Sequence, residues 1–138
     1  MPNKIQEFIV IHYKLFKLLF RATKKGYLRE IGWIDSYKNQ TPVNKKLQPI
    51  PWVTYSFISY IENRLNKSMS IFEYGSGNST FFYAKKVNRV ISVEHDKKWY
   101  EKLIEHIPEN VELTHCELKY GGDYCKSVVS TNRKFAII

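Results

Sequence analysis

Residues 70–80 read SIFEYGSGNST, an apolar run followed at once by two closely spaced glycines and then by polar residues. The first five residues predict a buried strand, the glycines predict a tight turn, and residues 79–86 predict a short helix. Gly75 can adopt backbone angles that a residue with a side chain resists, and Gly77 lets a ligand approach the backbone closely. Strand, glycine turn and helix in this order are the context that a nucleotide-binding turn needs.

The chain continues with the same alternation. Residues 89–94 predict a second strand, residues 97–107 a second helix and residues 111–116 a third strand. A polar loop that includes residues 121–124 follows, and residues 135–138 begin a fourth strand. Strands that alternate with helices form parallel βαβ units. We therefore expect an α/β fold, in which helices cover both faces of a parallel sheet. The sequence ends within the expected fourth strand of this sheet.

The sequence before residue 68 has a different pattern, so we expect an N-terminal helical extension over residues 1–67 and the sheet domain over residues 68–138. Residues 4–25 predict an amphipathic helix with an apolar face and a basic face. We favour a helix packed on the domain, because any surface helix needs an apolar face; a helix lying on a membrane surface is the alternative. Further helices are predicted over residues 27–38 and 53–66.

The chain has 138 residues and a net charge of +9, from 22 lysines and arginines and 13 acidic residues. This charge suits an anionic partner, namely a nucleic acid, an acidic membrane or a phosphorylated substrate. The basic residues are scattered, which is not typical of a nucleic-acid interface. A basic surface without a partner explains the charge as well.

The two cysteines, Cys116 and Cys125, lack the Cys-x-x-Cys spacing of a zinc or redox site and indicate thiols in a reducing compartment. No signal peptide is visible, and no run approaches the roughly 18 apolar residues of a membrane span. We therefore expect a cytoplasmic protein. The histidines are isolated in sequence, so no metal site is predicted.

Two glutamates narrow the choice of ligand. Glu94 ends the second strand about 20 residues after the first glycine, where a carboxylate accepts hydrogen bonds from ribose hydroxyls. Glu73 lies two residues before the first glycine and could reach the cationic end of a cofactor that carries an amino acid. The third glycine of the dinucleotide pattern is replaced by Thr80. A structural turn beside a surface glutamate is the simpler interpretation of the same residues.

Residues 72–80 resemble motif I of class I S-adenosylmethionine-dependent methyltransferases, and residues 90–96 resemble the end of the second strand of that Rossmann-like fold. The resemblance covers roughly residues 68–138. The stretch from Gly32 through Tyr55 is similar to the N-terminal region of a poorly characterised bacterial subgroup of these enzymes.

The resemblance implies a role for each matching residue. Glu73 and the backbone of residues 75–77 would hold the methionine part of the cofactor, Glu94 the ribose hydroxyls, and His95 would flank the adenine. Glu117 falls where many members have an acid near the adenine amino group. The expected cofactor-binding residues are Glu73, Tyr74, Gly75, Ser76, Gly77, Asn78, Ser79, Glu94, His95 and Glu117. This chain differs from the family at its C-terminal end. It stops at residue 138, whereas family members continue with about three more strands, so we expect a truncated enzyme of doubtful activity.

Trp52 and Tyr55 have two interpretations, because aromatic rings suit both adenine and a protein core. They either wall the cofactor or substrate site, or anchor the N-terminal extension. The methyl acceptor is expected to be a small molecule or a glycan, and the catalytic residues cannot be chosen from the sequence. An NAD-dependent oxidoreductase fragment and a non-enzymatic basic module that binds membrane or nucleic acid are the alternative functions.

Overall fold

The structure, a computed structural model, describes residues 4–136, with the side chains of residues 8–21 and 24–136. The chain divides into two compact units, residues 1–48 and residues 49–138. The boundary therefore lies nearer the N-terminus than the predicted one at residue 68.

The described residues of the first unit form the helices α1 (Lys4–Lys24), α2 (Tyr27–Glu30) and α3 (Trp33–Asn39). The helix predicted over residues 4–25 is confirmed. The piece predicted over residues 27–38 is helical as well, but it is broken between α2 and α3.

Gly32 causes this break. It has a φ of +88°, and a Cβ placed on it would lie 2.4 Å from the carbonyl carbon of Asn44. The loop after α3 is held against the helix by Ser36, whose hydroxyl donates to the Val43 carbonyl at 2.8 Å and accepts from the Val43 amide at 2.9 Å. Ile34 and Val43 are buried in this small lobe.

The second unit is built on a parallel sheet of three strands in the order β1 (Ser70–Tyr74), β2 (Arg89–Glu94) and β3 (Val111–His115). All three were predicted from the apolar runs of the sequence. In a parallel sheet the carboxyl ends of the strands meet at one edge. The segments that follow β1 and β2 therefore lie side by side.

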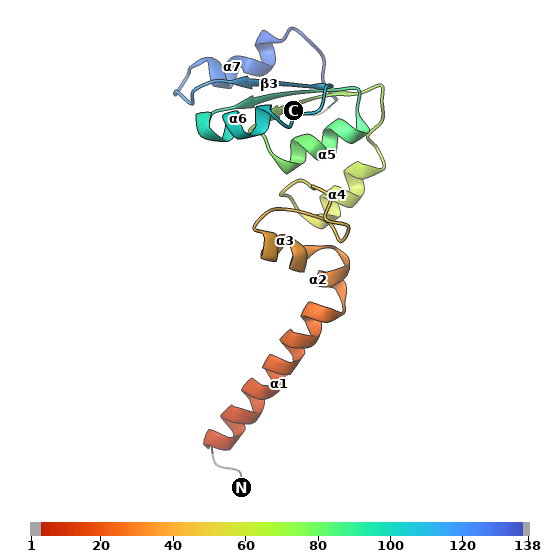
Figure 1. Cartoon of the computed structure of the whole chain (residues 1–138), viewed down its shortest axis with the longest axis vertical. Helices are drawn as coiled ribbons and strands as arrows, with labels where there is room; N and C mark the ends of the chain where they lie inside the picture. Colours follow the sequence, from red (N-terminus) through yellow and green to blue (C-terminus); the bar gives the residue numbers. More distant parts are fainter. Residues whose placement is uncertain (1–3, 137–138) are drawn as a thin grey trace. The chain divides into compact units, whose positions relative to one another are not determined.

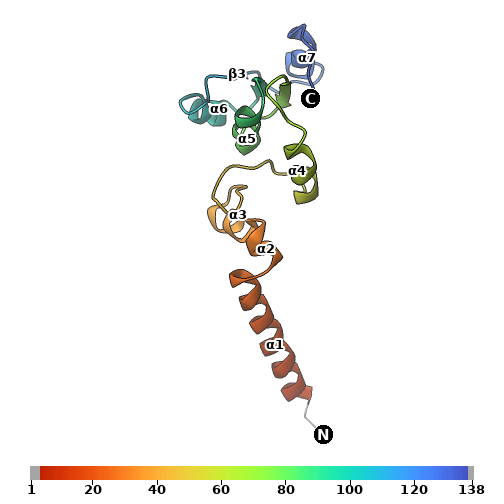
Figure 2. The same cartoon turned by 90° about the vertical axis from the view of Figure 1, so that its right-hand side faces the viewer.

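Helices cover both faces of this sheet, as predicted. The side chains of α4 (Tyr55–Glu62) and α5 (Asn78–Lys86) pack on one face, where α6 (Lys97–Ile104) also lies, and α7 (Asp123–Ser130) lies on the other (Figures 1 and 2). The unit is thus α/β with a helix–sheet–helix layering.

The alternation of side chains along each strand creates two cores. Ile71, Val90 and Val111 lie toward α4 and α5 and pack with buried residues of those helices. Phe72, Ile91 and Val93 lie toward α7. Both faces of β1 and β2 are apolar, which is why these strands read as continuous apolar runs rather than as alternating ones.

Three predictions about secondary structure were wrong in detail. Residues 123–130 form α7 instead of a polar loop, because Tyr124 and Val128 find partners on the Phe72 face that local sequence does not reveal. The second helix of the alternating region ends at Ile104 rather than at residue 107. The helix predicted over residues 53–66 is the shorter α4.

The predicted fourth strand is only partly within the described chain. Phe135 and Ala136 are not in a strand, although the Ala136 amide donates to the Ser70 carbonyl at 2.9 Å and Phe135 packs edge-on against Phe72. Residues 137 and 138 lie outside the described residues. The chain thus returns to the edge of β1 that β2 leaves free.

Candidate functional site

The glycine turn, residues 75–77, joins the end of β1 to the first turn of α5. Gly75 has a φ of +81°, a conformation that side chains rarely adopt, and its amide donates to the Val93 carbonyl at 2.8 Å. A Cβ on Gly75 or on Gly77 would meet no other atom within 4 Å. The glycines therefore leave open space beside the backbone, as a ligand-binding turn requires.

Glu94 ties this turn to the end of β2. Its Oε2 accepts from the Ser76 amide at 2.9 Å, and its Oε1 accepts from the amides of His95 and Asp96, both at 2.8 Å. The residue is 4% exposed. A carboxylate has about four lone-pair positions, so the chain's own amides leave room for one more donor.

Glu73 supports the turn through the hydroxyl group of Thr80. Its Oε2 accepts from the Thr80 hydroxyl at 2.6 Å, and the Thr80 oxygen in turn accepts from the Gly77 amide at 3.0 Å. Burial raises the pKa of Glu73, while hydrogen bonds from Ser79, Thr80 and Ser92 act in the opposite direction. Nearby Glu94 adds to the rise of this pKa. The hydrogen-bond partners of this partly buried carboxylate in the described chain are hydroxyl groups, which do not neutralise it.

Two residues that sequence analysis did not select also fix the turn. Ser92 donates to the Gly75 carbonyl at 3.0 Å and shares a 2.8 Å hydrogen bond with the Ser76 hydroxyl. The indole Nε1 of Trp99 donates to the Ser76 carbonyl at 2.8 Å. Ser92 could have been found as the one polar residue inside an apolar strand. Nothing in the local sequence marks Trp99, which Asp96 positions by capping α6.

Two aromatic rings lie close to the turn, His95 beside Glu94 and Tyr124 beside Gly75. The His95 ring is half exposed, and its Nδ1 lies 3.2 Å from the Glu94 carboxylate. Tyr124 meets the His95 ring edge to face, with centroids 5.9 Å apart, and contacts the Gly75 backbone. Burial raises the pKa of the Tyr124 phenol, and the Glu94 charge adds to this rise. Tyr124 was expected in a loop from which it could reach a substrate; it lies in α7 instead, and the position of this helix brings it here.

The remaining predicted site residues are placed as follows. Tyr74 faces α7, and its hydroxyl donates to the Cys125 carbonyl at 3.1 Å. Trp52 is 87% exposed, whereas Tyr55, the first residue of α4, packs against the core that α4 and α5 form with the sheet. Glu117 lies on the exposed loop after β3, where Lys119 forms an ion pair with it at 2.7 Å and lowers the pKa of its carboxyl.

Asn78 and Ser79 form the first turn of α5. Ser79 hydrogen-bonds the Glu73 carboxylate. In the part of the chain that the structure describes, no three histidine, cysteine or acidic residues come together as metal ligands. The arrangement is thus a rigid, polar turn with two acids, open on the side of the glycines.

No protein-family model matches this chain, and no curated protein matches it significantly. Its function therefore has to be inferred from the glycine turn and the groups that surround it.

Proposed function

We propose that this chain binds S-adenosylmethionine at the glycine turn and is the cofactor-binding part of a Rossmann-like methyltransferase. The observation that carries the proposal is the pairing of the turn with Glu94. The open backbone at Gly75 and Gly77 lies at the carboxyl end of β1, and Glu94 reaches it from the adjacent β2 at 2.9 Å. Ligands of open parallel sheets bind at this edge.

The residues present fit the chemical groups of this cofactor. Glu73 is a partly buried acid that accepts hydrogen bonds from hydroxyl groups, and a cationic amino group would neutralise it. Glu94 retains acceptor capacity for a ribose hydroxyl. His95 and Tyr124 offer ring surfaces beside the turn, and aromatic faces suit an adenine ring.

The cofactor supplies an electrophilic methyl group, and the chain's own part is to bind and orient it. Ser92, Thr80 and Trp99 hold the turn before any ligand arrives, so that little ordering is needed on binding. Such positioning provides much of the rate in transfer between two bound partners. The methyl acceptor in this proposal is a small molecule or a glycan.

The Rossmann-like character of the sheet is also part of the proposal. The Ala136 amide reaches Ser70 on the free edge of β1, which supports a fourth strand in that position. The free thiols of Cys116 and Cys125 support a reducing compartment such as the cytoplasm.

A calorimetric titration of the full chain with S-adenosylmethionine tests the proposal, with NADH titrated in parallel as the control. We expect saturable binding of S-adenosylmethionine and none of NADH, since Glu73 is poorly placed for a pyrophosphate. Binding of NADH alone, or of neither ligand by a chain that circular dichroism finds folded, would contradict it.

A further inference from the structure

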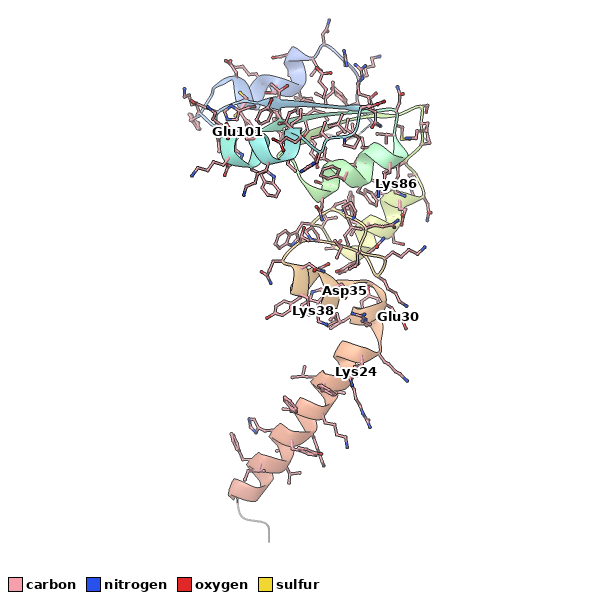
Figure 3. The ribbon with its side chains drawn as sticks, viewed as in Figure 1. Lys24, Glu30, Asp35, Lys38, Lys86 and Glu101 are labelled. Carbon is pink, nitrogen blue, oxygen red and sulfur yellow. The ribbon has the colours of Figure 1, made fainter. Side chains whose placement is uncertain are left out.

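Helix α1 exposes apolar side chains along its length. Phe16, Leu18 and Leu19 are 67%, 64% and 65% exposed, and Phe8 is 62% exposed. Figure 3 draws the side chains projecting from this helix, with Lys24 labelled near its C-terminal end. Large exposed apolar surfaces of this kind mark an interaction site rather than an ordinary surface helix.

The shape of the apolar surface restricts what can cover it. At 3.6 residues per turn, the apolar arc of α1 runs from Leu18 through Leu15 to Phe20 and spans about 200°. His12, one of the polar residues in this arc, folds back along the helix, because its Nδ1 lies 2.7 Å from the Phe8 carbonyl and its ring packs on the Phe8 ring. A coiled-coil partner covers only a narrow seam of a helix. Lipid covers an arc of any width.

The opposite side of α1 carries most of its cations, with the apolar Val10 among them. Lys14, Lys17, Arg21 and Lys24 fall within about 80° of one another on the helix. From residue 8 to residue 25 the sequence contains these four cations and Lys25, and no acidic residue. Arg21 and Lys24 also complement the negative end of the helix dipole. Lys14 and Lys17 lie in the middle of the helix, where the dipole does not explain them.

We propose that α1 lies in the surface of a membrane that contains anionic lipids, with its apolar arc among the acyl chains and its cations at the lipid phosphates. A wide apolar arc beside a narrow lysine and arginine face is typical of such interfacial helices. No described helix is long and apolar enough to span a bilayer. The helix therefore lies along the surface, and the inference does not depend on the proposed cofactor.

Sedimentation of the full chain with lipid vesicles tests this inference. Vesicles of phosphatidylcholine with and without phosphatidylglycerol are compared, at low and at high salt. We expect binding to the anionic vesicles that weakens with salt, because the lysine–phosphate attraction is screened.

Two double variants separate charge from position. Each lysine near an anionic surface contributes about fivefold in affinity, so Lys14→Gln with Lys17→Gln should weaken binding about 25-fold. Lys97→Gln with Lys98→Gln removes the same charge from exposed residues of α6 and should leave binding unchanged.

Leu15→Ser with Leu19→Ser should weaken binding to anionic vesicles as well, since it removes apolar side chains from the arc.

Three outcomes would overturn the inference. They are an absence of vesicle binding, an equal loss of binding in the two lysine double variants, and self-association of the free chain in place of vesicle binding. The last outcome, measured by analytical ultracentrifugation, would assign the arc to a second copy of the chain. Circular dichroism of each variant checks that α1 is still helical.

Discussion

Glu73 and Glu94 lie near the carboxyl ends of neighbouring parallel strands, but their surroundings stabilise a negative charge to different degrees. Glu94 receives three backbone amides, so its charge is used to join the glycine turn to the loop after β2. Glu73 is partly buried among hydroxyl groups, and this burial raises its pKa. The same isosteric change should therefore act in opposite directions at the two positions.

The substitution Glu73→Gln should stabilise the protein at neutral pH. A carboxyl whose pKa is raised on folding above its ordinary 4.5 contributes stability below that value and loses this contribution as pH rises through its folded pKa. The glutamine variant has no carboxyl to ionise and does not lose stability in this way. The difference between its free energy of unfolding and that of the wild type should therefore grow between pH 4.5 and neutral pH. Urea denaturation across this range measures it, and an advantage that shrinks with rising pH would refute the assignment.

Glu73→Gln should also weaken S-adenosylmethionine binding, since the neutral amide no longer attracts the ammonium group. A residue whose loss stabilises the fold but weakens binding is one kept for function. Unchanged affinity in calorimetry would leave Glu73 as a structural acid.

Glu94→Gln should destabilise the protein by about 1.5–3 kcal/mol, because the amide nitrogen must face a backbone N–H that the carboxylate accepted. Both carboxylate oxygens have such donors, so turning the amide over does not relieve the conflict. The free energy of unfolding from urea titration measures this effect. A variant as stable as the wild type would mean that Glu94 does not hold the turn.

At the scale of elements, strand β1, the glycine turn and α5 could be predicted because their information is local. An apolar run, two glycines and a polar helix start lie within residues 70–80. Helix α7 could not be predicted in this way. Its sequence, DYCKSVVS, contains β-branched residues and serines with modest helix propensity, and it is stabilised by contacts of Tyr124 and Val128 with distant strands.

The contacts of Tyr74 with α7 yield a prediction at this scale. Its hydroxyl donates to the Cys125 carbonyl and accepts from the Val128 amide. Tyr74→Phe should cost about 1 kcal/mol and speed amide exchange in α7 more than in β1 and β2. Hydrogen exchange followed by mass spectrometry resolves the two regions. Uniform acceleration would show that Tyr74 supports the sheet as a whole instead.

At the scale of the whole molecule, the chain divides into its two compact units after residue 48. A change from helical to alternating pattern marks residue 68, but Ile58 and Ile61 of α4 pack in the same core as Ile71. Only the folded sheet reveals which helix completes its core. Two residues of the site are also far from the glycine turn in sequence, since Tyr124 and Trp99 reach the turn from α7 and α6.

This division into two units predicts that substitutions to alanine will change the stability of the protein by different amounts in each unit. Ile61 is 4% exposed, and Ile61→Ala should destabilise the sheet unit by about 2–5 kcal/mol through the cavity it leaves. Leu15, half exposed on α1, is a matched control, and Leu15→Ala should change stability by about 0.5 kcal/mol or less in the absence of lipid. Urea denaturation followed by tryptophan fluorescence measures both. Equal losses would contradict the assignment of α4 to the sheet unit.

The central claim, that S-adenosylmethionine binds at the glycine turn, is tested most directly by the affinities of a graded series at Gly77. A Cβ at this position meets no atom of a residue beyond its chain neighbours within 4 Å, so Gly77→Ala should fold with a nearly unchanged thermal midpoint, and circular dichroism checks that Gly77→Val also folds. We predict that calorimetry will find weaker S-adenosylmethionine binding in the alanine variant and none in the valine variant, because the added methyl groups occupy the space of the cofactor. Wild-type affinity in a folded Gly77→Val protein would contradict the claim.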